Sequence, residues 1–176
     1  MINDAYPYYF IKYEYPAQPE EALCRKILYR FKSAKSKLVY IVEVEEYPHR
    51  VFAIKFYPKA FRLSKKRFNL LTNTFEPRRI IHTCINIMLE LYTKYTDASF
   101  GFTAARCENE KQKENVKRFR VYALLMATYF SDKYFEHTEN RMHNSYLMIN
   151  RKMLSVNPQF TTELVEFFDE QYVFDE

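Results

Sequence analysis

The chain has 176 residues, a formal net charge of +5 and 48% hydrophobic residues, including 16 Tyr and 16 Phe. This length is typical of one domain with a buried core, and the hydrophobic content excludes an intrinsically disordered chain. The single glycine excludes the glycine-rich phosphate loops of P-loop and dinucleotide-binding proteins. We therefore predict one folded domain over residues 1–176.

The cysteines and the N-terminus indicate in which cellular compartment the protein is located. Cys24, Cys84 and Cys107 form an odd set without CxxC spacing, so the sequence predicts neither a disulfide framework nor a zinc site. The N-terminus lacks the basic start and apolar region of a signal peptide, and no apolar run approaches the ~18 residues of a membrane span. We predict a cytoplasmic protein with free thiols and no membrane partner.

Charge is distributed unevenly along the chain. Residues 59–79 include seven Lys or Arg and one acid, Glu76, whereas residues 163–176 include six acids and no Lys or Arg. The basic region favours an anionic ligand, and the acidic region would repel nucleic acid. Two alternatives are that both regions are solvated faces, or that they contact each other.

The first predicted elements are a strand and a helix. Residues 8–15 are β-prone and end at Pro16, which predicts a strand. Pro19 followed by two acids is typical of a helix start, and we expect this helix to run to about Ser33. The apolar residues that recur in it at helical spacing are Leu23, Ile27, Leu28 and Phe31.

The next segments favour β-structure. Residues 38–46 and 51–57 are rich in β-branched and aromatic residues and are separated by YPHR, whose proline indicates a turn. They predict an antiparallel hairpin. After a basic stretch, residues 67–72 are a weaker strand candidate.

A long helix and a short strand follow. Pro77 suits the first turn of a helix, and the apolar stripe from Ile80 to Tyr95 predicts its length. Residues 99–105, which include Gly101, predict a strand, and the polar residues 106–114 predict a surface loop.

The last part of the chain predicts two helices and a hairpin. Asn115 can cap a helix in which Phe119, Tyr122, Met126 and Tyr129 share one face. Residues 134–138 and 145–150 read as a hairpin, and residues 161–172 as a closing helix. Because a strand, a helix and a strand in succession imply parallel neighbours and the hairpins require antiparallel ones, we predict an α+β fold with a mixed, mostly antiparallel sheet flanked by helices.

The residues after the strand at 99–105 carry a family resemblance. A strand reading FGFTAA is followed by a loop and by NVKRFRVY, which places Tyr122 seven residues after Asn115. With the order of the elements, this pattern resembles the GCN5-related N-acetyltransferases, with one N-terminal helix where many members have two. An alternative interpretation of Asn115 and Tyr122 is a helix cap and a core aromatic residue.

The resemblance implies an acetyl-CoA-dependent N-acetyltransferase that acts on an amine of a small molecule or protein. It implies that Asn115 contacts the cofactor and that the Tyr122 hydroxyl protonates the departing coenzyme A thiolate. A developing thiolate needs a proton donor within hydrogen-bond reach, and a partly buried tyrosine can supply one.

The start of the long helix departs from the family pattern. Family members carry an Arg or Gln followed by glycines whose amides hold the cofactor pyrophosphate, whereas this chain reads TNTFEPRRIIHT, and Pro77 lacks an amide hydrogen. Side chains would have to compensate, with arginine binding phosphate in a bidentate manner, and Glu76 would oppose them. The cofactor-binding candidates here are Arg78, Arg79, Ile80, His82 and Thr83.

An amine acceptor must lose a proton, so the reaction also needs a base. The nearest candidates are Glu136 and His137 on the penultimate strand, although a lone histidine is more often structural. The sequence contains no GxSxG motif and no cysteine in a nucleophile context, which disfavours hydrolase chemistry.

The competing class is a non-enzymatic binding module on an inactive acetyltransferase-like scaffold. Basic and aromatic residues alternate in AFRLSKKRFNLL and VKRFRVY, as expected for phosphate contacts with base stacking on single-stranded nucleic acid. The same pattern arises when a strand alternates buried aromatics with exposed lysines. A third alternative is association through the aromatic surface or the terminal helix, as a homodimer or a heteromer.

Overall fold

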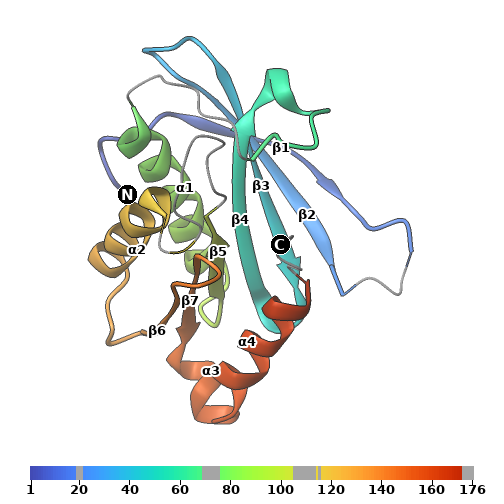
Figure 1. Ribbon diagram of the computed structural model, residues 1–176, viewed down its shortest axis with the longest axis vertical. Helices are drawn as coiled ribbons and strands as arrows, with labels where there is room; N and C mark the ends of the chain where they lie inside the picture. Colours follow the sequence, from blue (N-terminus) through green and yellow to red (C-terminus); the bar gives the residue numbers. More distant parts are fainter. Residues whose placement is uncertain (19–21, 69–75, 105–113, 115, 172–176) are drawn as a thin grey trace.

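Seven strands form one open sheet in the order β1-β2-β3-β4-β5-β7-β6. The computed structural model describes residues 1–18, 22–68, 76–104, 114 and 116–171 (Figure 1). Among the strands in these ranges, only β4 and β5 are parallel neighbours, and all other neighbours are antiparallel. This confirms the predicted α+β class with a mixed, mostly antiparallel sheet. The strands are β1 Tyr8–Glu14, β2 Arg25–Lys32, β3 Val39–Tyr47, β4 Val51–Pro58, β5 Ser99–Thr103, β6 Phe135–Asn140 and β7 Ser145–Asn150.

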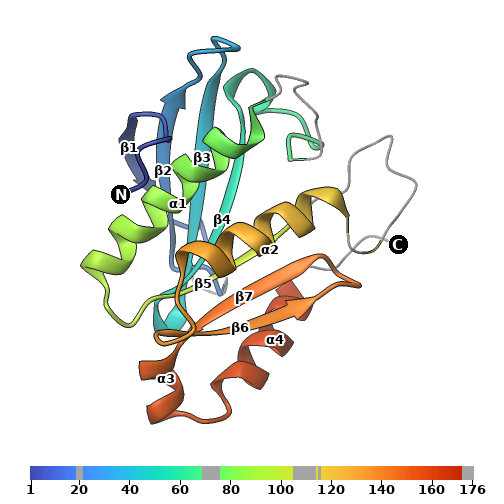
Figure 2. The ribbon, with the colours of Figure 1, turned by 90° about the vertical axis from the view of Figure 1, so that its left-hand side faces the viewer.

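Helices lie on both faces of the sheet. The α1/α2 face is covered by α1 Pro77–Lys94 and α2 Lys117–Tyr129 (Figure 2). The opposite face, called the α4 face, is covered in part by α4 Phe160–Gln171, which follows the short α3 Arg151–Val156. Two 3-10 turns, η1 Pro48–Arg50 and η2 Lys59–Phe61, precede and follow β4.

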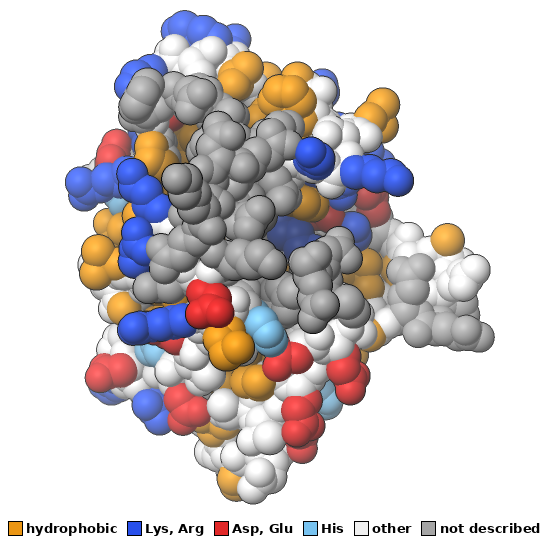
Figure 3. Space-filling model, in the orientation of Figure 1, with side chains coloured by type: hydrophobic (Ala, Val, Ile, Leu, Met, Phe, Trp, Pro, Cys, Tyr) orange, Lys and Arg blue, Asp and Glu red, His pale blue; other side chains and the backbone are white. Residues whose placement is uncertain are grey.

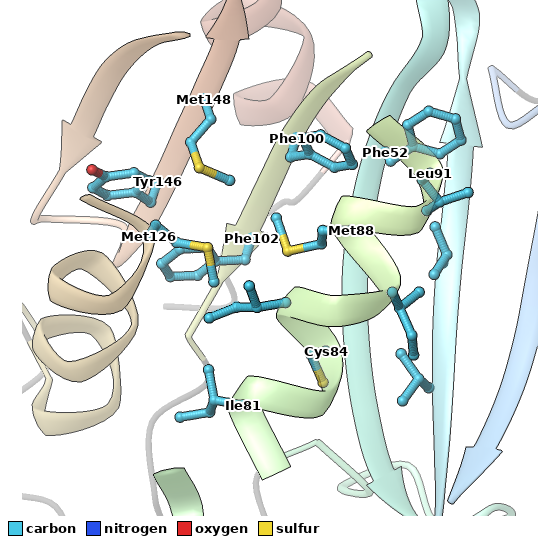
Figure 4. Packing of buried hydrophobic residues seen from close by; sticks show 14 of the residues in the cluster. Phe52, Ile81, Cys84, Met88, Leu91, Phe100, Phe102, Met126, Tyr146 and Met148 are labelled. Carbon is cyan, nitrogen blue, oxygen red and sulfur yellow. The ribbon is translucent and has the colours of Figure 1, made fainter. Parts of the chain in front are cut away.

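The main core lies between the sheet and the α1/α2 face. The helix α1 connects the parallel strands β4 and β5 and packs Met88 and Leu91 against the sheet, near Phe52 and Phe100 (Figure 4). The Phe52 and Phe100 rings stack with centroids 5.9 Å apart. The apolar stripe that predicted α1 is therefore the surface that covers the parallel pair.

The prediction of a helix that ends near Ser33 is wrong, because Arg25–Lys32 form β2. Ile27, Tyr29 and Phe31 alternate onto the α1/α2 face, and the Phe31 ring stacks on Tyr40 of β3 at 5.1 Å. Ile27 and Phe31 fit both a helical spacing and a period of two, and pairing with β1 and β3 decides between them. The expected helix start at residues 19–21 lies outside the described residues.

The other predicted elements are confirmed where the structure describes them. They are the strands at 8–15 and 99–105, the hairpin of β3 and β4, the helices α1, α2 and α4, and the hairpin of β6 and β7. The short α3 was not predicted; the side chain of Asn150 caps it by accepting a hydrogen bond from the Lys152 amide at 3.0 Å.

Several expectations fall on parts of the chain that the structure does not describe. Arg67 and Phe68 lie in a turn, and the rest of the strand candidate at 67–72 is outside the described residues. The same holds for residues 105–113 of the predicted loop and for Asn115. Val116 occupies the N-cap position of α2, and its amide donates a hydrogen bond to Asn144 Oδ1 at 2.8 Å.

Candidate functional site

The parallel strands β4 and β5 separate part of the way along their length. They pair at Val51 with Ser99, Phe52 with Phe100 and Ala53 with Gly101. Beyond these pairs, β4 stays with β3 and β5 stays with β7, so the two strands diverge (Figure 2). We call the space between residues 54–58 and 102–103 the β4/β5 gap. Ligands of open sheets bind in crevices at the carboxyl ends of parallel strands, which makes this gap the candidate site.

Three aromatic rings line the gap on the α1/α2 face. The Tyr122 ring of α2 lies 6.3 Å from Phe56 of β4 and 5.4 Å from Phe102 of β5, measured between centroids. Tyr122 is partly exposed, while Phe119 and Met126 on the same helix are buried. Packing of α2 therefore holds the predicted proton donor between the two diverging strands.

Phe68 approaches the gap from the α4 face. Its ring packs edge-on against Tyr57 of β4 at 5.4 Å, and the guanidinium of Arg67 lies 4.6 Å from its centroid. Its carbonyl oxygen accepts a hydrogen bond from Arg118 Nη1 of α2 at 3.0 Å. Because α2 covers the opposite face, this bond connects the two faces of the sheet at the gap and brings two arginines to it.

A buried charge cluster lies beside the gap on the α4 face. Lys55 of β4 contacts Glu45 at 2.7 Å, and Lys26 of β2 contacts Glu43 at 2.8 Å and Glu45 at 3.5 Å. The Tyr47 hydroxyl donates to Glu45 at 3.1 Å. Burial acts to lower the pKa of Lys26, but the hydrogen bonds and negative charges of Glu43 and Glu45 together outweigh it, and the pKa is raised.

The charge cluster was missed by the sequence reasoning, although the sequence carries a signal for it. Glu43 and Glu45 alternate with the apolar residues Val42 and Val44 in the middle of a strand. Successive side chains of a strand point to opposite faces of the sheet. When apolar and acidic residues alternate, the apolar side chains therefore lie on one face and the acidic side chains on the opposite face. The basic partners on β2 were hidden by the wrong helix prediction for that segment.

The start of α1 already holds a carboxylate. Glu76, at the N-cap position, is buried and accepts hydrogen bonds from the hydroxyls of Tyr6 and Ser33. Burial acts to raise the pKa of Glu76, but hydrogen bonds from Ser33, Tyr6 and Ser36 outweigh it and lower the pKa. An ionised carboxylate at this position opposes phosphate, and Pro77 removes one amide donor. The first turn of α1 therefore does not fit a pyrophosphate.

The cofactor-binding candidates on α1 mainly contact the chain's own N-terminal segment. The Arg79 guanidinium lies 4.2 Å from the centroid of the Tyr6 ring. Thr83 Oγ1 accepts a hydrogen bond from the Tyr6 amide at 2.9 Å. His82, fully buried, donates from Nδ1 to the Asp4 carbonyl at 3.0 Å, and its Nε2 lies 3.3 Å from the Tyr129 hydroxyl.

The other two α1 candidates differ from these in environment. Ile80 is buried in the main core, and Arg78 is exposed. Taken together, Arg79, His82 and Thr83 hold the N-terminal segment in place, whereas the contacts of Tyr122 are with β4 and β5. The structure does not bring the two predicted sets into one cluster.

The two predicted bases point to opposite faces of β6. Glu136 Oε1 accepts a hydrogen bond from Thr161 Oγ1 of α4 at 2.7 Å. His137 lies on the α1/α2 face, where its Nδ1 is 2.9 Å from the Tyr146 hydroxyl, and burial lowers its pKa. Only His137 shares a face with Tyr122.

A continuous row of rings links His137 to the gap. The Tyr146 ring stacks on Phe102 at 5.5 Å, and Phe102 in turn contacts Tyr122. Burial raises the pKa of Tyr146 to about 12, so its hydroxyl is protonated at neutral pH. The candidate site thus consists of the β4/β5 gap with Tyr122, flanked by His137 on one face and by the charge cluster on the other.

Comparison of the chain with protein-family models, with curated proteins and with solved structures found no match. Among the described residues, no three or more His, Cys, Asp or Glu side chains are grouped so that they could hold a metal ion. None of the helices in the described part of the chain is long and apolar enough to cross a membrane.

Proposed function

We propose that this chain is an acyl-CoA-dependent N-acetyltransferase whose reaction takes place at the β4/β5 gap, in the cytoplasm. The observation that carries the proposal is the divergence of the only parallel pair among the described strands, with Tyr122 held between Phe56 and Phe102. The order of elements from β3 to β7 and the resemblance at residues 99–122 support the same function, whereas residues 25–32, expected to belong to the N-terminal helix of that order, form β2.

The gap suits a ligand that carries amide groups. Beyond Ala53, the edge of β4 that faced β5 has no strand partner among the described residues. An extended amide chain can add to such an edge through backbone hydrogen bonds. The pantetheine arm of coenzyme A contains amides, so the gap fits this arm, while Arg67 and Arg118 supply positive charge nearby.

Acetyl-CoA supplies an acetyl group activated as a thioester. In the transfer, a nitrogen–carbon bond forms at the amine, the carbon–sulfur bond breaks, one proton leaves the nitrogen and one reaches the sulfur. Tyr122 donates the proton to the sulfur. His137 Nδ1, which lies 2.9 Å from the Tyr146 hydroxyl, accepts the hydroxyl proton as that hydroxyl takes the proton from the amine.

A thermal-shift titration tests the proposal. A ligand that binds only the folded state raises the melting temperature, so acetyl-CoA and CoA should each stabilise the chain. An unchanged melting temperature with both compounds at millimolar concentration would remove the main support for the function.

The second candidate is a catalytically inactive acetyltransferase-like scaffold that binds protein or nucleic acid. The observation in its favour is the start of α1, where buried Glu76 and Pro77 stand in place of a phosphate-binding turn. Stabilisation by a short oligonucleotide in the same titration, without stabilisation by CoA, would select this candidate.

A further inference from the structure

The α4 face contains a groove that lies away from α4. It has a volume of about 420 Å³ and lies between β1 and the segment that follows β4. Its floor is formed by Leu28, Ile41 and Tyr57, which are buried in one small cluster with Phe68 packed beside them. This floor is apolar and flat, because the three residues come from neighbouring strands of the sheet.

The walls of the groove are cationic. Lys12, Arg30, Lys59 and Arg62 line it, all four are exposed, and no acid is among the lining residues. Two of these cations contact an acid, because Glu14 lies 2.7 Å from Lys12 and 3.6 Å from Arg62. Within the described part of the chain, Arg30 and Lys59 have no ion-pair partner. Their charge is therefore available to an anionic ligand.

Exposed aromatic rings stand next to these cations. Tyr9, which pairs with Arg30 across β1 and β2 and so shares its face, is 62% exposed. Phe10 is among the lining residues, but its ring packs against Tyr29, which lies on the α1/α2 face. Phe61 in η2 is 40% exposed and lies in sequence between Lys59 and Arg62. Figure 3 shows Lys and Arg side chains beside hydrophobic ones at the upper right, where β1 and the segment after β4 lie in Figure 1.

We propose that this groove binds single-stranded nucleic acid. Cations that neutralise phosphates, combined with exposed rings on which bases stack, are the features that sequence-tolerant single-strand binding requires. A duplex would offer no unstacked base to the rings. An acidic peptide would use the cations and the apolar floor but would leave the exposed rings of Tyr9 and Phe61 without a matching partner. The site is separate from the β4/β5 gap and does not depend on the proposed acetyltransferase activity.

Fluorescence anisotropy of the full chain with a labelled single-stranded oligonucleotide of about 12 nucleotides tests the proposal, since comparable single-strand sites span about 4–16 nucleotides. We expect binding at about 50 mM salt. The logarithm of the association constant should fall linearly with the logarithm of the salt concentration, with a slope of about −0.7 for each phosphate that the protein contacts. The double variant Arg30→Glu/Lys59→Glu should lose about tenfold or more in affinity. Tyr9→Ala should lose about fivefold or more, through lost stacking.

The matched control is Lys133→Glu/Lys152→Glu, which makes the same change in net charge at exposed positions before β6 and in α3. It should bind within about twofold of the unchanged chain, because neither residue is among those that line the groove. Circular dichroism and melting curves check that each variant folds. Because the substituted side chains are exposed, folding should be retained.

Four results would overturn the proposal. They are the absence of binding at low salt, an equal loss in both double variants, tighter binding of a polyglutamate peptide than of the oligonucleotide, and tighter binding of anionic lipid vesicles. The second result would show that bulk charge alone attracts the oligonucleotide. The third and fourth would assign the groove to an acidic protein segment or to a membrane surface.

Discussion

The ring of Tyr122 meets the ring of Phe102 edge to face, with centroids 5.4 Å apart and planes inclined by 71°. Phe102 is itself fixed, because it stacks on Tyr146 at 5.5 Å. The position of Tyr122 at the β4/β5 gap is therefore set by ring packing, and its hydroxyl can be removed while that packing is kept.

Tyr122→Phe should leave CoA affinity and melting temperature nearly unchanged and slow acetyl transfer by about 100-fold or more, because it removes only the proton donor. The measurement is kcat for transfer to an amine, alongside Kd for CoA. Tyr92→Phe is the control: Tyr92 packs against Phe135 at 5.1 Å on α1, away from the gap. Equal turnover by Tyr122→Phe and the unchanged chain would exclude Tyr122 from the mechanism.

Glu76→Ala should lower the free energy of unfolding by about 1–3 kcal/mol, because the buried hydroxyls of Tyr6 and Ser33 lose their acceptor. The lowered pKa of Glu76 also makes this contribution depend on pH. It is fully present above the ordinary pKa of 4.5 and is lost as the pH falls through the lower pKa of the folded state.

Melting curves between about pH 2 and pH 7 check the prediction for Glu76, since this range spans the titration of carboxyl groups. The unchanged chain should lose stability in acid more steeply than Glu76→Ala. Glu166→Ala, an exposed substitution on α4, should behave like the unchanged chain. Parallel acid profiles for all three proteins would show that Glu76 is not held as a carboxylate.

Much of the fold could be predicted from the sequence where periodicity was unambiguous. The stripe from Ile80 to Leu91 fits only a helix, and it became α1. Ile27 and Phe31 fit a helix and a strand equally well, and the contact that decides between the two, Phe31 on Tyr40, forms only in the folded sheet. Local propensity carries no information about such cross-strand pairs.

The candidate site was less predictable for a similar reason. Its parts come from β3, β4, β5, α2 and the turn at Phe68, and only Tyr122 and His137 were named beforehand. The roles of His82 and Thr83 depend on hydrogen bonds to Asp4 and Tyr6, which lie 77 or more positions away in the sequence. A residue beside a helix start can bind a ligand or hold a distant segment, and sequence spacing alone does not distinguish the two.

Gly101→Ala should destabilise the chain by about 1–3 kcal/mol through overpacking. A Cβ at this position would lie 2.9 Å from Leu147 Cδ2 and 3.3 Å from Phe168 Cζ, where α4 packs on the sheet. Urea denaturation measures the loss. Leu147→Val shortens the side chain whose methyl group lies nearest to the new Cβ. In the Gly101→Ala background it should therefore recover part of the lost stability. If the double variant instead loses the further stability that is usual for Leu→Val, this packing is contradicted.

Glu45→Ala should lower the free energy of unfolding by about 1–3 kcal/mol, because Lys55 and Tyr47 lose a buried charged partner. The loss should be smaller when Lys55 is already Met, since the ion pair between Lys55 and Glu45 is then already absent. A double-mutant cycle in urea should give a coupling energy of about 0.5–3 kcal/mol. Strict additivity would mean that the pair does not act as a unit.

The most direct test of the central claim is isothermal titration calorimetry of the unchanged chain with CoA, repeated with Phe56→Trp, which enlarges a ring that lines the β4/β5 gap. We predict saturable binding by the unchanged chain and a weakening of about tenfold or more in Phe56→Trp, with both proteins folded, since overpacking a site excludes its ligand. Absence of binding to the unchanged chain at millimolar CoA, or equal affinity of both proteins, would contradict the claim that the gap holds the cofactor.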